Sequence, residues 1–146
     1  MRIRILAAGK PSLAYAKSGV DEYLKRLTRY GACEVEYLKA GDSVSVSAAL
    51  LERSAGSFRI AMDERGKDLT TQNWADQFTA LEMRGEVKTV CFLIGASDGH
   101  TPELRTTADA VWRLSALTLQ HELALVVLLE QIYRVATYRR GEPYHR

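Results

Sequence analysis

The sequence has few of the residues that build metal sites and disulfide frameworks. Its 146 residues include two cysteines and three histidines. These are too few and too scattered for a zinc cluster, so we expect no metal. Cys33 and Cys91 lie in separate strand-like runs, which favours two buried thiols over a disulfide and gives no sign of an oxidising compartment.

Long hydrophobic runs are also missing. No stretch approaches the roughly 20 apolar residues of a membrane span. Near the N-terminus, charges interrupt the short apolar run of Arg2–Ala8, unlike the uninterrupted core of a signal peptide. We therefore expect a cytoplasmic protein that does not enter a membrane.

A large excess of one charge is absent too, since the net charge is +2. A protein that binds nucleic acid by charge alone usually carries more. Any contact with RNA must then be local, led by shape, or shared between subunits. The chain also lacks Gly-x-Gly-x-x-Gly and a phosphate-binding Gly-Lys-Thr/Ser loop, which excludes these two nucleotide-binding fingerprints.

What the chain does have is an alternation of strand and helix patterns. Period-two or continuous apolar runs predict strands, and apolar residues at helical spacing predict helices. The predicted strands are Arg2–Ala8, Cys33–Tyr37, Phe58–Met62, Val87–Ile94 and Val111–Leu114, and the predicted helices are residues 12–27, Ser43–Ser54, Thr71–Met83 and Leu104–Ala110. With 47% hydrophobic content and no repeat or linker, the sequence predicts one α/β domain over residues 1–146, a mostly parallel sheet flanked by helices.

Two glycine-containing segments interrupt this pattern. Gly66–Asp68 predicts a turn after the third strand. Val87–Ile94 has the composition of a central strand covered on both faces, and Gly95–Gly99 follows at its carboxyl end, where open α/β sheets bind ligands. Taken alone, Gly95–Gly99 fits an ordinary strand-to-helix turn better than a ligand site. Thr101 and Pro102 then predict a capped helix start.

The last third of the chain is unusual in three ways. Leu114–Gln120 is uncharged and is expected to be buried. Glu122–Leu129 is apolar on all sides, which indicates a helix covered by its own core and by a second subunit, and hence a homodimer. Arg139–Arg146 concentrates basic and aromatic residues where most chains fray, so we expect this tail to bind a ligand.

Five motifs carry a family resemblance. They are Met62-Asp-Glu-Arg-Gly-Lys67, Phe92-Leu-Ile-Gly95, Ser115-Ala-Leu-Thr-Leu-Gln-His121, Leu129-Glu-Gln-Ile-Tyr-Arg134 and Arg140-Gly-Glu-Pro-Tyr-His145. In this order they resemble the SPOUT methyltransferases, and within them the small enzymes that act on large-subunit ribosomal RNA. The resemblance covers essentially the whole chain. It implies a SPOUT fold with a deep C-terminal trefoil knot, against the general rule of unknotted chains.

The resemblance also implies an activity. A homodimer would transfer a methyl group from S-adenosylmethionine to N3 of a pseudouridine in 23S ribosomal RNA, on the assembled ribosome. The implied cofactor-binding residues are Met62, Gly95, Ala96, Leu114, Ser115, Ala116, Leu117, Thr118, Leu119 and Gln120. A neutral loop can pair main-chain groups with the edge of adenine while apolar side chains cover its faces. Without the resemblance, the same loop reads as a buried core connection.

The implied catalytic residues are polar and lie near the C-terminus: His121, Arg134, Tyr144, His145 and Arg146. We expect the tail of one subunit to close over the cofactor of the other. His145 or Tyr144 would assist proton removal, Arg134 and Arg146 would hold phosphate or a developing oxyanion, and His121 would order the cofactor loop. Taken singly, His121 also fits a helix cap and Arg134 a surface charge. Tyr144 and His145 also fit a frayed chain end.

Two positions depart from the family pattern. Ala96 stands where a second glycine is expected, and Leu125 stands where an arginine is expected. If that arginine contacts RNA or a partner, Arg113 or Arg139 would have to replace it. Three alternatives stay open: a related transfer RNA methyltransferase, a ribosome-associated binding protein that has lost catalysis, and a generic nucleotide-binding α/β protein.

Overall fold

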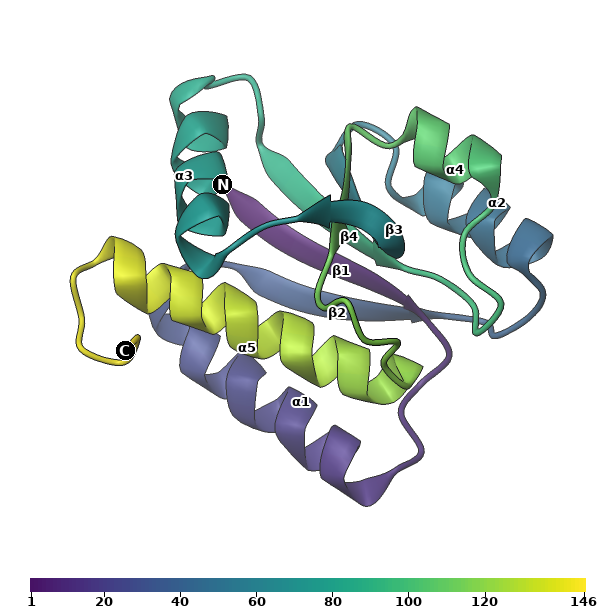
Figure 1. Cartoon of the computed structure of the whole chain (residues 1–146), viewed down its shortest axis with the longest axis horizontal. Coiled ribbons are helices and arrows are strands. Elements are labelled where there is room, and N and C mark those ends of the chain that lie inside the picture. Colours follow the sequence, from purple (N-terminus) through teal and green to yellow (C-terminus); the bar gives the residue numbers. More distant parts are fainter.

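The computed structural model describes residues 1–146 as a five-stranded, all-parallel sheet with helices on both faces (Figure 1). The strand order is β2-β1-β4-β3-β5. The strands are β1 (Arg2–Ala8), β2 (Cys33–Leu38), β3 (Phe58–Asp68), β4 (Thr89–Ile94) and β5 (Ala110–Arg113). The helices are α1 (Ala14–Leu27), the 3₁₀ helix η1 (Thr28–Tyr30), α2 (Ser43–Arg53), α3 (Thr71–Met83), α4 (Pro102–Thr107) and α5 (His121–Arg139).

The central strand β4 separates two hydrophobic cores. Val90, Phe92 and Ile94 face the larger core, which α1, α3 and α5 cover. Cys91 and Leu93 face the smaller core, to which α2 and α4 contribute. Because successive side chains of a strand point to opposite faces, a strand buried on both sides must be apolar throughout. The prediction of a central, doubly covered strand is confirmed.

Most helix predictions are also confirmed. α3 has the predicted bounds, and Thr70 caps it by accepting a hydrogen bond from the Asn73 N–H. α4 begins at Pro102 after the predicted Thr101 cap. Its predicted end at Ala110 is wrong, because the chain leaves the helix at Ala108 and Ala110 pairs with β3.

The predicted turn at Gly66–Asp68 is wrong. β3 continues to Asp68 and pairs with β5 a second time after a bulge, so that both Met62 and Lys67 lie opposite Trp112. A Cβ on Gly66 would lie 2.5–2.8 Å from backbone atoms of Trp112. The missing side chain therefore allows the strand to return to β5 after the bulge.

α5 and α1 lie side by side (Figure 1). The carboxylate of Glu122 joins their N-terminal ends. Glu122 Oε1 accepts hydrogen bonds from the Ser12 N–H at 2.6 Å and the Leu13 N–H at 3.0 Å. These donors precede α1, which has no side-chain cap of its own. The backbone hydrogen bonds, that of Leu13 first, lower the pKa of Glu122.

Two further expectations have clear outcomes. Cys33 and Cys91 are free thiols as predicted, but only Cys91 is buried and Cys33 is half-buried. Burial raises the pKa of Cys33 to about 12 and that of Cys91 to about 11. The expected burial of Leu114–Gln120 is wrong, since Ala116, Leu117 and Thr118 are exposed in the single chain. None of the helices has both the length and the hydropathy required of a membrane span.

Candidate functional site

A cavity of about 460 Å³ opens at the bulge of β3 and the carboxyl ends of β4 and β5. Its walls come from the bulge of β3, the Gly95–Gly99 loop, the segment after β5 and the first turn of α5. The lining residues are Met62, Asp63, Glu64, Arg65, Ile94, Gly95, Ala96, Ser97, Asp98, Gly99, His100, Arg113, Leu114, Ser115, Leu117, Thr118, Leu119, Gln120, His121 and Ala124. The carboxyl ends of parallel strands leave backbone groups free for a ligand here.

All of the sequence-predicted cofactor residues line this cavity except Ala116, which is exposed. They come from three segments that are far apart in the chain: the start of the bulge in β3, the end of β4, and residues 114–120. Of the predicted catalytic residues, only His121 lies at the cavity. The sequence analysis missed His100, Arg65 and Arg105, which shape the same region.

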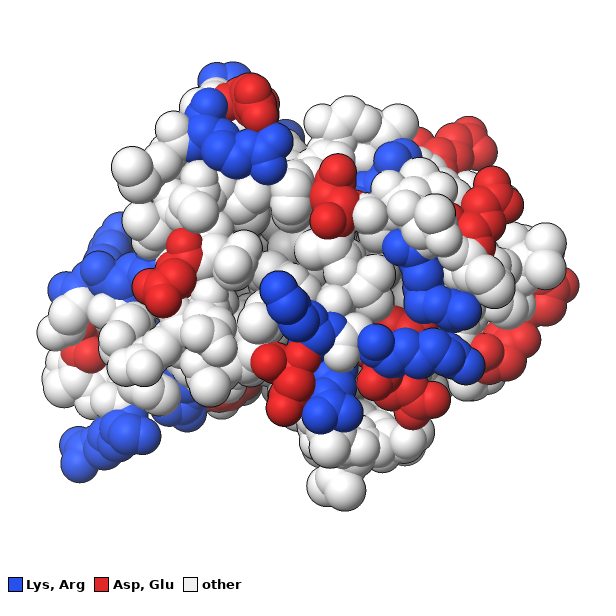
Figure 2. All heavy atoms as spheres, turned by 45° about the horizontal axis from the view of Figure 1, so that its top comes forward, with Lys and Arg blue, Asp and Glu red and all other residues white.

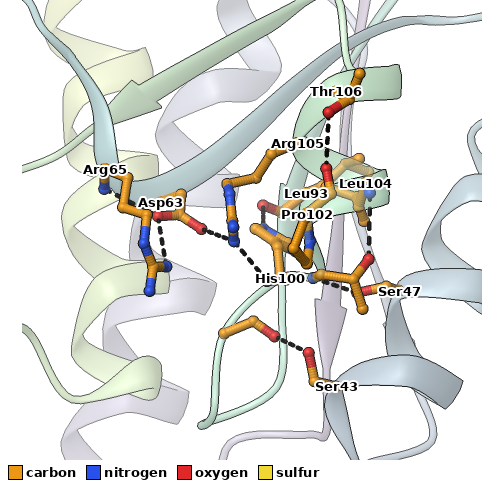
Figure 3. Close-up of polar contacts among 12 residues, drawn as sticks. Ser43, Ser47, Asp63, Arg65, Leu93, His100, Pro102, Leu104, Arg105 and Thr106 are labelled. Carbon is orange, nitrogen blue, oxygen red and sulfur yellow. Dashed lines mark hydrogen bonds and ion pairs between the residues drawn. The ribbon is translucent and has the colours of Figure 1, made fainter.

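Gly95 is required at the end of β4 because the imidazole of His100 packs against it. A Cβ on Gly95 would lie 2.8 Å from His100 Nδ1. His100 Nε2 donates to the Leu93 carbonyl at 3.1 Å, while Nδ1 is buried without a partner (Figure 3). Since burial lowers the pKa of His100, the ring is neutral near pH 7. Nothing in the sequence pattern pairs residue 100 with residue 95.

The departure at Ala96 fits the backbone. No residue other than glycine has a positive φ, and Gly99, at +90°, makes the sharp turn of the loop. The Gly99 N–H donates to the Ala96 carbonyl at 2.9 Å. The methyl group of Ala96 packs against the smaller core. An alanine is therefore accommodated here without backbone strain.

Asp63 forms a buried acidic wall of the cavity, with its side chain 4% exposed. Its Oδ1 accepts a hydrogen bond from the Arg65 N–H at 2.9 Å, and both Arg65 and Arg105 place a guanidinium nitrogen 3.6 Å from the carboxylate (Figure 3). Arg105 Nη1 also donates to the carbonyl of His100 at 2.7 Å. Asp63 therefore stabilises the bulge of β3 and links it to the loop under Gly95.

The segment after β5 is held by local hydrogen bonds. The Leu117 N–H donates to Ser115 Oγ at 2.9 Å, and Thr118 Oγ1 donates to Glu64 at 3.0 Å. Gln120 caps α5, since its Oε1 accepts from the N–H groups of Glu122 and Leu123, both at 3.0 Å. The capping role considered for His121 therefore belongs to Gln120, and His121 is exposed.

The other predicted catalytic residues gather at the far end of α5. Arg134 lies roughly 20 Å along the helix axis from His121 at about 1.5 Å per residue. Tyr144 O–H donates to Glu130 Oε2 at 2.9 Å, and Arg134 Nη1 lies 3.3 Å from His145 Nδ1. Within one chain the tail contacts the C-terminal half of α5 and does not reach the cavity at the N-terminal end of this helix. Arg146 is exposed and forms no side-chain hydrogen bond or ion pair with this group.

Comparison with known proteins agrees with this geometry. The family model described as "Predicted SPOUT methyltransferase" matches residues 1–145. The chain belongs to the SPOUT methyltransferase family. Two curated relatives are called "Ribosomal RNA large subunit methyltransferase H". Those of Thermus thermophilus and Deinococcus radiodurans are 45% and 42% identical, and each match covers 100% of this chain and 99% of the relative.

A solved structure shares the SPOUT fold. The crystal structure of tRNA (m1G37) methyltransferase from Aquifex aeolicus matches 100% of this chain and 75% of that chain, with a TM-score of 0.58 and 13% sequence identity. At this identity the likeness concerns the fold alone. SPOUT methyltransferases generally use S-adenosylmethionine. The C-terminal trefoil knot stays a prediction that membership of the SPOUT family supports.

Leu125, the second departure from the SPOUT pattern, is 2% exposed in the larger core. The side chain of Leu125 points from α5 into the larger core of its own chain. In the single chain Leu125 therefore packs into the core and offers no surface to RNA. The replacement of the expected arginine by Arg113 or Arg139 stays a prediction. Arg113 pairs with Asp68 and Arg139 with Glu82.

Proposed function

We propose that two copies of this domain, residues 1–146, form a cytoplasmic dimer that methylates N3 of a pseudouridine in large-subunit ribosomal RNA. The observation that carries the proposal is the full-length similarity to relatives named for large-subunit ribosomal RNA methylation. The coincidence of the cavity with the predicted cofactor segments supports it. The assembled ribosome is the proposed substrate, because a net charge of +2 suits a protein that docks largely by shape.

The cavity suits S-adenosylmethionine in size and chemistry. Its volume of about 460 Å³ lies within the range of roughly 300–1,000 Å³ common for small-molecule sites. Met62, Leu114 and Leu119 offer apolar contacts to a flat ring. Gly95 lines the cavity, and the absence of a Cβ there lets the His100 ring pack beside the end of β4. When bound, S-adenosylmethionine supplies a methyl group already activated by a positively charged sulfur.

A second subunit is proposed because the polar tail and the cavity lie at opposite ends of α5. Apolar side chains remain accessible around the cavity end: Leu117 is 73% exposed, Tyr15 53% and Leu13 40%. On α5 itself, Leu123, Val126 and Val127 are only half-buried by the single chain. Exposed apolar groups that adjoin one another mark interaction sites. An antiparallel pair of subunits would cover them and bring each tail toward the other's cavity.

In this arrangement each subunit has two tasks. The residues around the cavity bind the donor and exclude water, and His121 lies at the entrance. The partner's Arg134, Tyr144, His145 and Arg146 would hold the base. The proton on N3 leaves to solvent, the nitrogen forms a bond to the methyl carbon, and the bond from that carbon to sulfur breaks. Burial raises the pKa of Tyr144, as does its hydrogen bond to Glu130, so Tyr144 is a poor base near pH 7.

The acidic and basic side chains interleave over the face in Figure 2 without forming a patch of one sign. Electrostatic attraction spread over this face would therefore be weak. Local contacts from the tail and the fit to a large particle would supply the selectivity.

The experiment that tests the function starts from large ribosomal subunits of a strain lacking the gene. The purified protein and radiolabelled S-adenosylmethionine should label these subunits or the assembled ribosome, and mass mapping should locate the methyl group on one pseudouridine. Transfer to transfer RNA instead would favour the rival methyltransferase. Absence of donor binding in calorimetry would favour a non-catalytic or generic nucleotide-binding protein.

The shared site is tested with mixed dimers. One parent lacks residues 144–146, and it should bind the donor nearly as well as the full chain but not turn over. The other parent carries Gly95→Val, which fills the space beside His100. Each parent should be inactive, whereas a mixed dimer, purified with two different tags, regains one complete site. Mixed dimers no more active than their parents would overturn the shared site while leaving the methyltransferase assignment intact.

A further inference from the structure

Glu130 is the centre of the polar contacts at the C-terminal end of α5, although the sequence analysis gave it no role. Its Oε2 accepts from the Tyr144 O–H and from Arg134 Nη2, each at 2.9 Å, and Arg134 Nε lies 3.1 Å away. The side chain of Glu130 is 20% exposed. We call Glu130, Arg134, Tyr144 and His145 the tail cluster. Its carboxylate joins a helix residue to a residue of the terminal tail.

Aromatic contacts strengthen this arrangement. The guanidinium of Arg134 lies over the ring of Tyr144 at 4.8 Å, and Tyr133 meets the same ring edge-on at 4.7 Å. A guanidinium held on one side by a carboxylate and on another by an aromatic face has few rotamers left. The tail therefore has one defined position in the single chain.

The contact between Arg134 and His145 determines which nitrogen of the imidazole carries the proton. Glu130 occupies Nε and Nη2 of Arg134, and Nη1 lies 3.3 Å from His145 Nδ1. A guanidinium has five donors and no acceptor. His145 Nδ1 must then accept, and a neutral imidazole that accepts at Nδ1 carries its proton on Nε2. No residue of the chain hydrogen-bonds Nε2, while Tyr138 packs edge-on against the ring at 5.5 Å.

We propose that Glu130 is a positioning residue that holds Arg134 and Tyr144 so that His145 presents Nε2–H as a hydrogen-bond donor to a carbonyl of the target base. This proposal rests on the proposed function. In a uracil ring, N3 lies between two carbonyls, which take up negative charge as the N3 proton leaves. A fixed donor at one of these oxygens stabilises that charge. His145 then acts as a donor, and the proton passes to water.

A pair of substitutions distinguishes a donor from a base. His145→Gln places an amide N–H₂ near the position of Nε2 and removes the acceptor at Nδ1. His145→Asn places a carbonyl near Nδ1 and has no donor near Nε2. We expect His145→Asn to lower kcat on the order of 100-fold, as for loss of one oxyanion donor, and His145→Gln to retain much more activity. Equal loss in both variants would overturn the donor role.

The positioning role has a readout that does not depend on activity. The chain has three histidines, so the ¹⁵N signals of His145 are assigned by comparison with His145→Asn. Nitrogen chemical shifts separate a lone-pair nitrogen from a protonated one. In the full chain we expect a lone pair at Nδ1 and a proton at Nε2. Glu130→Gln should give a mixture of the two His145 tautomers. The ¹⁵N signals should also become narrower, because the imidazole ring is more mobile.

The matched control is Glu22→Gln, which removes an exposed carboxylate from another i,i+4 pair with arginine. It should leave the His145 signals and kcat unchanged. Glu130→Ala should lower kcat on the order of 100-fold, the cost of a misplacement near 1 Å, with donor affinity unchanged in calorimetry. A wild-type Nδ1–H tautomer, or Glu130→Ala with normal kcat, would overturn the proposal. If His145 has the expected tautomer but the protein does not methylate RNA, the proposed function is wrong and the positioning role of Glu130 still holds.

Discussion

Gly66→Ala is the sharpest test of how β3 reaches the cavity. The new methyl carbon would lie 2.5 Å from the Trp112 carbonyl carbon and 2.7 Å from its nitrogen. The closest approach is 0.9 Å short of the 3.4 Å at which ordinary contact begins (3.4 − 2.5). Both obstacles are backbone atoms within a strand, so no side-chain rotation relieves the clash.

The expected cost follows from this geometry. Overpacking in a well-packed region costs about 1–3 kcal/mol, and an immovable backbone places Gly66→Ala at about 3 kcal/mol or above. For a chain of this size each 1 kcal/mol shifts the melting temperature by about 2–4 °C, which gives a loss of roughly 6–12 °C. Donor binding should fall as well, because the bulge before Gly66 brings Asp63 and Arg65 to the cavity.

Urea unfolding at one fixed protein concentration is the assay, because the stability of the proposed dimer would depend on concentration. Gly41→Ala is the matched control. A Cβ at Gly41 would meet Val46 at 3.8 Å, and Gly41 has no positive φ. It should therefore be neutral or stabilising by about 0.4–1 kcal/mol. A Gly66→Ala variant as stable as Gly41→Ala would refute the close approach of β3 and β5.

Three further predictions follow from buried contacts. Gly95→Ala should weaken binding of S-adenosylmethionine in calorimetry, because the new methyl group meets the His100 ring at 2.8 Å. Adding His100→Ala should restore part of the affinity. An unchanged affinity in the single Gly95→Ala variant would contradict the packing of His100 against Gly95. The pKa of Glu122 is lowered from 4.5, so its contribution to stability is present above the unfolded pKa and lost as pH falls through the folded one. Stability measured from neutral pH to about pH 3 should therefore fall more steeply in the wild type than in Glu122→Gln, and parallel curves would count against the contact. Leu125→Ala should cost about 2–5 kcal/mol in urea unfolding, and Leu125→Arg at least as much because its charge would be buried unpaired; a Leu125→Arg protein of wild-type stability would show that the side chain is not confined to the core.

The secondary structure was largely predictable because its signals are local. Trp74, Phe78 and Leu81 recur at helical spacing and form the buried side of α3. Val90–Ile94, the buried part of β4, is apolar at every position, as required of a strand between two cores. The failures were local patterns overridden by distant contacts. Gly66 resembled a turn glycine, yet it serves the close approach to Trp112.

The candidate site was predictable only in part. The cofactor segments were identified through the motif resemblance, and they meet at one cavity. His100 lies outside the five motifs, and Glu130 was given no role although it lies within one of them, because a histidine and a helix carboxylate have many ordinary roles. Their importance depends on neighbours such as Gly95 and Tyr144, whose positions follow from the path of the chain.

The sequence by itself determined the α/β class, the order of the elements and the family, because these depend on periodicity and on contiguous motifs. Only the tertiary structure decided which polar groups meet. Glu122 caps the start of α1 from 109 and 110 residues away, and the tail lies at the opposite end of α5 from the cavity. Such pairings depend on how the sheet and helices pack, since the energy of a hydrogen bond depends on distance in space and not on separation along the chain.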